Sequence, residues 1–143
     1  MKPVDALADI PFLRALGAKL ARAEEGIAEI ALTVAPDHEN SWGVAHGGVV
    51  MTLLDVAMAR AGRTLIDREG SEHMSAVTVE MKTSFFRPAV GELVARGKVL
   101  HRSTTMAYCE AELVDTKGQL VAKSLGTFKF LRRKDASTLT RLG

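Results

Sequence analysis

The chain has 143 residues, of which 47% are hydrophobic and 25% charged, the size and balance of one globular domain with a single core. Its formal net charge of +2 is too small to indicate a nucleic-acid partner, and the short basic run Arg132-Arg133-Lys134 is typical of a solvated chain end. The single cysteine, Cys109, excludes an intrachain disulfide and fits a reducing compartment. We expect it to be a small, buried strand residue.

The composition predicts a single domain over residues 1–143, with a core at about 10–131 and a polar, frayed tail at 132–143. The N-terminus lacks the basic, apolar and small-residue segments of a signal peptide. Asp55 and Arg60 interrupt the longest apolar run before it reaches the length of a membrane span. We therefore expect a cytoplasmic protein that binds neither nucleic acid nor membranes.

The first elements in chain order are a short helix and a strand. Residues 1–20 have apolar residues at mostly helical spacing and predict an amphipathic helix after Pro11, which suits a first helical turn. Residues 26–34 alternate between apolar and polar side chains, which predicts a first strand that ends at Pro36. A polar loop over residues 37–44 follows.

The long helix that comes next carries one unusual carboxylate. From Gly48 to Ala59 the only charged residue is Asp55, so the helix is apolar nearly all round and is predicted to be buried. We expect it to end between Ala61 and Asp67. A carboxylate in an apolar wall resists ionisation unless something compensates it. Two interpretations stay open: Asp55 is catalytic, or it caps a neighbouring backbone or surfaces at a subunit contact.

The start of this helix is suited to binding a ligand oxygen. In His46-Gly47-Gly48 the glycines leave the first free N–H groups of the helix open to close approach, at the positive end of its dipole. Nine residues separate His46 from Asp55, about 13 Å along the axis and about half a turn around it. They cannot form one dyad within one helix. If both belong to one site, the protein is at least a dimer with two identical sites.

The rest of the chain has the period of strands. After a turn at residues 68–71, the pattern predicts strands at 75–86, 92–102, 105–115 and 119–131. Their short links predict an antiparallel meander. With the first strand, this makes an α+β fold in which five antiparallel strands wrap one helix.

A family resemblance rests on Asn40, the His46-Gly47-Gly48 run, Asp55 and the turn Phe86-Arg87-Pro88-Ala89. Together they resemble the hotdog-fold acyl-CoA thioesterases, most closely the PaaI-like branch named for phenylacetate degradation. The resemblance covers about residues 10–131. It implies a hotdog fold with a long buried central helix, a curved five-stranded antiparallel sheet and a short N-terminal helix. It also implies dimers that form one continuous sheet, an active site at the dimer interface and, in many members, tetramers.

The resemblance implies roles for six residues. Asp55 matches the catalytic carboxylate of this branch, acting as general base for water or as nucleophile. Gly47 and Gly48 match the positions whose N–H groups polarise the thioester carbonyl. The remaining matches orient the loop, the substrate carbonyl or the water: His46, Asn40 and Thr78.

Some of these residues also have a structural interpretation. His46 is typical of a helix cap, and Asn40 of an Asx-turn. The rival carboxylate is Glu80, which we expect to be exposed or paired across strands, given its neighbours Thr78 and Lys82.

The expected substrate is an aryl- or medium-chain acyl-CoA, hydrolysed to the free acid and coenzyme A. Four side chains suit the phosphates of coenzyme A, although each is also typical of a solvated surface: Arg87, Lys98, Arg102 and Ser103. His38, His73 and His101 lack metal-ligand spacing, so we expect no metal and no cofactor besides the coenzyme A of the substrate. The alternatives are a non-catalytic acyl-CoA sensor and a hotdog hydratase or dehydratase.

Overall fold

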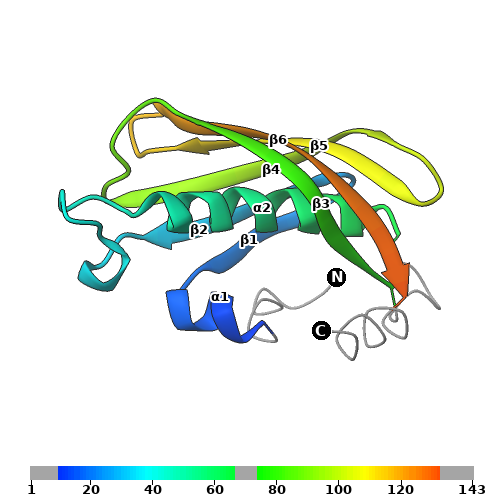
Figure 1. Cartoon of the computed structure of the whole chain (residues 1–143), viewed down its shortest axis with the longest axis horizontal. Helices are drawn as coiled ribbons and strands as arrows, with labels where there is room; N and C mark the ends of the chain where they lie inside the picture. Colours follow the sequence, from blue (N-terminus) through cyan, green and yellow to red (C-terminus); the bar gives the residue numbers. More distant parts are fainter. Residues whose placement is uncertain (1–9, 67–73, 133–143) are drawn as a thin grey trace.

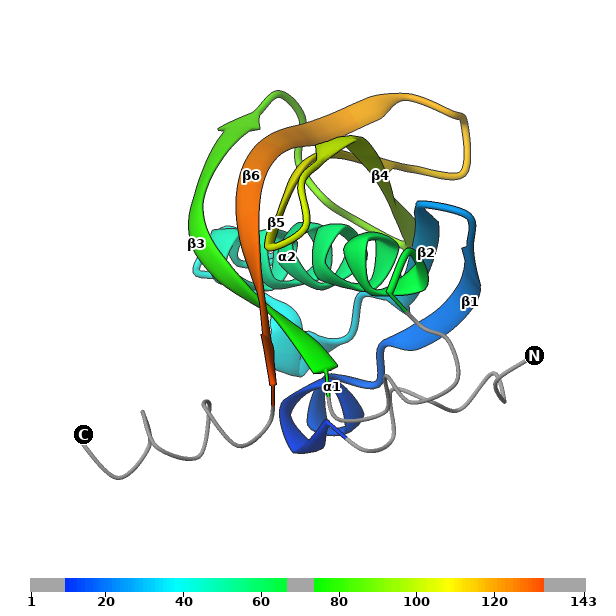
Figure 2. The ribbon, with the colours of Figure 1, turned by 90° about the vertical axis from the view of Figure 1, so that its right-hand side faces the viewer.

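The computed structural model describes residues 10–66 and 74–132. Its helices are α1 (Pro11–Leu16), the single-turn η2 (Pro36–His38) and the long α2 (Gly47–Thr64). Its strands are β1 (Lys19–Glu24), β2 (Ile27–Thr33), β3 (Met74–Phe85), β4 (Glu92–Arg102), β5 (Met106–Val114) and β6 (Leu120–Arg132). Figure 1 shows α2 lying along the sheet, and the end view in Figure 2 shows the sheet curved around α2. The predicted hotdog architecture is confirmed.

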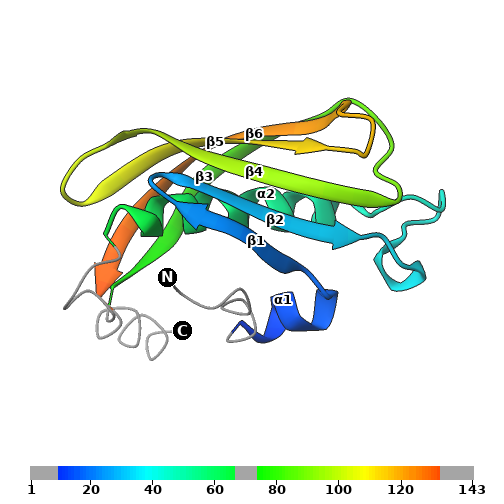
Figure 3. The same ribbon diagram turned by 180° about the vertical axis from the view of Figure 1, so that it is seen from behind.

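The sheet has six antiparallel strands in the order β1-β2-β4-β5-β6-β3. The prediction of five strands was wrong because residues 19–24 form the edge strand β1, in front in Figure 3. Only Leu20 of β1 is buried, so this strand has no alternating pattern. The sequence feature that marks β1 is the pair Glu25-Gly26 that follows it. In the structure these two residues have φ angles of 48° and 80°, which are those of a two-residue hairpin turn.

The predicted four-strand meander holds for β4, β5 and β6 and is wrong for β3. β3 pairs with β6, so β5 and β6 separate it from β4. The link over residues 86–91 crosses this gap. Six extended residues reach about 20 Å, and strands three positions apart in a sheet are only about 14 Å apart. A short link therefore does not require that two strands be neighbours.

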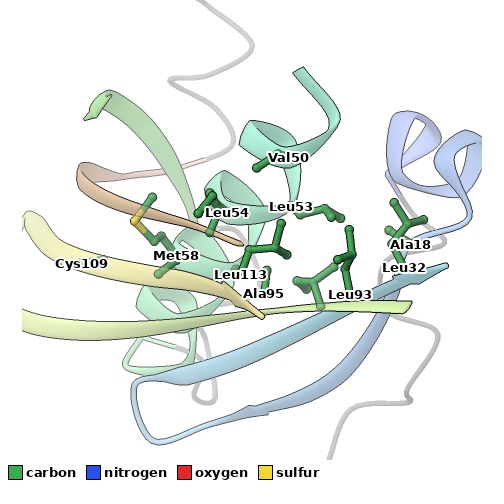
Figure 4. Packing of buried hydrophobic residues seen from close by; sticks show 14 of the residues in the cluster. Ala18, Leu32, Val50, Leu53, Leu54, Met58, Leu93, Ala95, Cys109 and Leu113 are labelled. Carbon is green, nitrogen blue, oxygen red and sulfur yellow. The ribbon is translucent and has the colours of Figure 1, made fainter. Parts of the chain in front are cut away.

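The core lies between α2 and the concave face of the sheet. Figure 4 shows side chains of α2 beside side chains of the strands, all of them buried: Leu53, Leu54, Met58, Leu93 and Leu113. The opposite stripe of α2 is exposed or half-buried: Gly48, Met51, Thr52, Asp55 and Ala59. The expectation of a helix buried nearly all round holds for the side that faces the sheet and is wrong for the side that carries Asp55.

Helix and sheet approach each other most closely at Gly97 of β4. A Cβ built on Gly97 would lie 2.3 Å from the carbonyl oxygen of Ala57 and 2.7 Å from the amide nitrogen of Met58. Cys109 on the neighbouring strand is fully buried, as expected, and burial raises the pKa of its thiol to about 12. None of the helices in the described ranges is long and apolar enough to cross a membrane.

Candidate active site

Asp55 lies half-buried on the free stripe of α2, facing the edge strand β3. The Thr78 hydroxyl donates a hydrogen bond to Asp55 Oδ1 at 2.5 Å. Burial raises the pKa of Asp55 above the usual aspartate value, and the hydrogen bond from Thr78 offsets part of that rise. Asp55 is therefore easier to protonate than an ordinary aspartate, and the Thr78 hydroxyl fixes the orientation of its carboxylate.

A β-bulge orients Thr78 towards α2. The register between β3 and β6 shifts between Thr78 and Glu80, so that Val79 is an extra residue of β3. On the near side of the bulge, Thr78 pairs with Phe128, which is fully buried on the face of the sheet that α2 covers. The bulge thus places the Thr78 hydroxyl beside Asp55.

Beyond the bulge, the rival carboxylate points away from α2. Glu80 pairs with Thr127 and accepts a 2.7 Å hydrogen bond from its hydroxyl. The cross-strand pairing expected for Glu80 is confirmed, with Thr127 of β6 as the partner. Glu80 therefore lies on the opposite face of the sheet from Asp55.

His46 caps the N-terminus of α2. Its ψ of 142° is extended, and its Nδ1 accepts a 2.8 Å hydrogen bond from the Gly48 amide. The amide of Gly47 has no hydrogen-bond acceptor among the residues that the structure describes. This amide lies at the positive end of α2 and is available to a ligand oxygen.

Phe85 closes one side of this helix start. A Cβ built on Gly47 would lie 3.6 Å from the Phe85 ring, and 53% of Phe85 is nevertheless exposed. The sequence alone does not mark Phe85 as a site residue, because an apolar residue in an alternating strand resembles any core residue. The only feature that marks it is its place beside Phe86, directly before the turn.

The loop that enters α2 is held by two polar side chains. Asn40 Oδ1 accepts hydrogen bonds from the amides of Trp42 at 2.8 Å and Val44 at 3.4 Å, which is an Asx-turn. In this chain Asn40 therefore shapes the loop. The buried His38 bonds the Ala35 amide and the Leu16 carbonyl through its ring, and its own carbonyl accepts from the His46 amide. His38 thus joins α1 to the start of α2.

The six residues form two groups rather than one. His46, Gly47, Gly48 and Asn40 lie at the start of α2, whereas Asp55 and Thr78 lie near its middle. Eight residues of helix separate Gly47 from Asp55, about 12 Å along the axis. One chain therefore does not bring its own free amide and its own carboxylate to a single reacting atom.

The four residues suggested for coenzyme A are also spread over the molecule. Arg87 lies in the link over residues 86–91. The Ala45 amide, in the loop before α2, donates a hydrogen bond to the Ala89 carbonyl of this link. Arg87 Nη1 donates to the Leu120 carbonyl at 2.7 Å. At the other end of α2, Arg102 donates to the Leu65 carbonyl at 3.1 Å.

The other two residues of this set lie elsewhere. Ser103 accepts hydrogen bonds from the Thr105 and Met106 amides. Lys98 is exposed on the outer face of β4. Of the four, Arg87 alone lies at the same end of α2 as the Gly47 amide.

No three His, Cys, Asp or Glu side chains of residues 10–66 and 74–132 gather as metal ligands. His73, the turn at 68–71 and most of the predicted tail lie outside these ranges. Arg132 is the last residue of β6.

Comparison with known proteins identifies the family. Residues 43–122 match the model of the thioesterase superfamily. The medium/long-chain acyl-CoA thioesterase YigI of Escherichia coli is 29% identical over 131 residues, which cover 83% of this chain and 84% of YigI. A mutant of the phenylacetic acid degradation protein PaaI from Thermus thermophilus is 34% identical, with a TM-score of 0.73 and coverage of 83% of this chain and 97% of that one.

The PaaI protein of Escherichia coli is also similar, at 26% identity and a TM-score of 0.76, over 88% of either chain. The family match extends over more than half of the 143 residues, and the fold agrees with it. The chain belongs to the thioesterase superfamily: it is a hotdog-fold enzyme of the thioester-hydrolase class, with PaaI proteins among its relatives.

Proposed function

We propose that the protein hydrolyses aryl- or medium-chain acyl-CoA thioesters to the free acid and coenzyme A, at a site shared by two subunits. The observation that carries the proposal is the Asp55 carboxylate, half-buried on α2 and held by Thr78. Asp55 acts as general base for water or as nucleophile. The balanced reaction, thioester and water to acid and thiol, needs no group other than substrate, water and protein.

Activation of the thioester carbonyl is assigned to the start of α2. An oxyanion site needs a preorganised donor that no protein group occupies, and the Gly47 amide meets this condition. The Gly48 amide donates to His46 instead. We assign Gly48 a second role, keeping the entrance open, because a Cβ there would lie 3.0 Å from His46 Nδ1.

Two subunits are needed to bring these groups together. Asp55 bonds Thr78 near the middle of β3, whereas a Cβ built on Gly47 would contact Phe85, the last residue of that strand. Thr78 and Phe85 are about 20 Å apart along β3. In the sheet order, β3 is an edge strand, so a second chain has access to it. A dimer in which the helix start of one subunit lies beside Asp55 of the other brings the two groups together and uses the accessible edge of β3. Two such dimers then form the expected tetramer.

Coenzyme A is the remaining component of the substrate. Arg87 is our choice for a phosphate contact, because it lies at the same end of α2 as Gly47 and its guanidinium suits phosphate. Lys98, Arg102 and Ser103 stay weaker candidates. Arg102 and Ser103 already bond the chain around the end of α2, and Lys98 is on the outer face.

The proposal is tested by thiol release from a panel of phenylacetyl-, benzoyl-, hexanoyl- and palmitoyl-CoA. We expect turnover of at least one of the first three and weaker turnover of palmitoyl-CoA. The buried Cys109 thiol, with its raised pKa, contributes little background to such an assay. Binding of all four thioesters without thiol release would contradict hydrolysis and would support a sensor instead.

The pH dependence of kcat/KM tests the role of Asp55 further. Asp55 must be ionised to act, so activity is expected to fall as pH falls through its raised pKa, at higher pH than for an ordinary aspartate. Thr78→Val removes the hydrogen bond that lowers this pKa, and the acidic limb is expected to move to higher pH. Thr78→Ser keeps the hydroxyl and is expected to keep the limb in its place. An identical limb in Thr78→Val would contradict this role of Asp55.

A further inference from the structure

His38 is a buried histidine whose two ring nitrogens both have hydrogen-bond partners. Its Nδ1 accepts a 2.9 Å hydrogen bond from the Ala35 amide, and its Nε2 lies 2.8 Å from the Leu16 carbonyl oxygen. An amide only donates and a carbonyl only accepts, so these partners assign a neutral ring with its proton on Nε2. One form of the ring therefore satisfies both contacts.

The ring holds the single turn η2 together. The Ala35 amide donates to the His38 ring, and in return the His38 amide donates to the Ala35 carbonyl at 2.9 Å. A turn of three residues has little stability of its own. Close packing does not replace these bonds, because Ala35 and His38 line an open cavity of about 580 Å³ that extends to Leu16 of α1. The two reciprocal hydrogen bonds therefore fix the turn.

The turn in turn fixes the first peptide of α2. The His38 carbonyl accepts a 2.8 Å hydrogen bond from the His46 amide. On the other side, the His46 ring accepts the Gly48 amide at 2.8 Å. The peptide that carries the Gly47 amide lies between these two bonds. The direction of the Gly47 N–H thus depends on where η2 holds the His38 carbonyl.

We propose that His38 is a positioning residue for thioester hydrolysis, which acts through η2 and His46 to aim the Gly47 amide at the thioester oxygen. This deepens the function proposed above and rests on it. The bond from Ala35 is the one that acts on the site, because it closes the turn whose carbonyl holds His46. The bond to Leu16 ties α1 to the same ring and contributes to stability alone. Misplacing a catalytic group by about 1 Å costs about 100-fold in rate, so a loosened turn is sufficient to impair the site.

Two conservative substitutions separate the two ring bonds. His38→Asn places an oxygen where Nδ1 was, directly on Cγ, and keeps an acceptor for the Ala35 amide. His38→Gln places an amide nitrogen near the position of Nε2 and keeps a donor for the Leu16 carbonyl. Each variant loses one buried hydrogen bond, so their unfolding temperatures are expected to fall by similar amounts. The two variants are matched in stability and differ in which bond survives.

Only one of these variants is expected to lose activity. His38→Gln is expected to lower kcat for the best acyl-CoA substrate about 10-fold or more with little change in KM, because an oxyanion donor acts in the transition state. His38→Asn is expected to keep kcat within about 3-fold of wild type. Equal losses of kcat in the two variants would overturn the proposal, and so would wild-type kcat in His38→Gln.

A double variant tests whether His38 acts through the Gly47 amide. Gly47→Pro removes that amide proton at a first helical position, which suits proline. In this background His38→Gln is expected to lower the residual kcat less than about 2-fold, because the donor that it misplaces is already absent. An undiminished effect of His38→Gln would show that it acts on another group and would overturn the proposal.

Amide hydrogen exchange tests the same order without any turnover. The His46 and Gly48 amides are bonded at the start of α2. By NMR, both are expected to exchange about 10-fold faster in His38→Gln than in wild type and at an unchanged rate in His38→Asn. Equal rates in the two variants would overturn the role of the Ala35 bond. If the wild type released no thiol, the proposed function would fail, whereas these rates would still decide whether His38 orders the helix start.

Discussion

Asp55→Asn is expected to lower kcat for thiol release from the best acyl-CoA substrate by about 1000-fold or more, with little change in substrate binding. The reason is that a general base or a carboxylate nucleophile contributes about this much to the chemical step, and an amide can serve as neither. Glu112→Gln is the matched control, because Glu112 is an exposed carboxylate that pairs with Lys123. It is expected to keep wild-type kcat, and substantial turnover by Asp55→Asn would exclude Asp55 from the chemistry.

Loss of the fold is not expected to explain the loss of activity. Folding raises the pKa of Asp55, so the folded chain holds this proton more tightly than the unfolded chain does. Stability therefore falls as pH rises from the ordinary aspartate pKa through the raised one. At neutral pH the ionised Asp55 weakens the fold, and Asn relieves that cost. The unfolding temperature of Asp55→Asn at neutral pH is expected to be no lower than that of wild type.

Gly97→Ala is expected to lower the free energy of unfolding by about 3 kcal/mol or more. The added methyl carbon would lie 2.3 Å from the carbonyl oxygen of Ala57 and 2.4 Å from its carbonyl carbon, which are backbone atoms of α2. Backbone cannot rotate away as a side chain does, so α2 must move from the sheet. Chemical denaturation measures the change.

Gly118→Ala is the matched control for this effect. Gly118 has a φ of 74° and no atom within 4 Å of an added Cβ, so only backbone strain opposes the substitution, at about 1 kcal/mol. Equal losses in the two variants would show that helix–sheet contact at Gly97 is not the cause.

The fold was predictable wherever one face of an element is buried against another. β4, at Glu92–Arg102, has the predicted bounds, because its alternation follows burial. β1 was missed because one buried residue, Leu20, leaves no period. The place of β3 beside β6 was missed because link length limits which strands can be neighbours without selecting one. Strand order depends on how the sheet curves around α2, a property of the whole chain.

The individual residues of the site were more predictable from the sequence than their arrangement in space. Asp55 was identified as the one charge in an apolar helix, and the run of His46 and two glycines as a helix start. The His46 ring accepts a hydrogen bond from the Gly48 amide and leaves the Gly47 amide free. This depends on side-chain geometry, which the spacing of residues in the sequence does not show. The contact of Phe85 with Gly47 joins residues far apart in the sequence and has no local pattern.

In the proposed dimer, each site combines Asp55 of one subunit with the Gly47 amide of the other. Gly47→Pro removes only that amide: proline suits the first helical position, and His46 already has the extended ψ of 142° that a following proline requires. Gly47→Ala keeps the amide and serves as its control.

The decisive measurement is thiol release by an equimolar mixture of Asp55→Asn and Gly47→Pro, each nearly inactive alone. Half of the randomly mixed dimers are heterodimers, and each heterodimer has one intact site and one doubly defective site. The mixture is therefore expected to recover about a quarter of wild-type activity. No recovery, with heterodimer formation verified, would contradict the shared site.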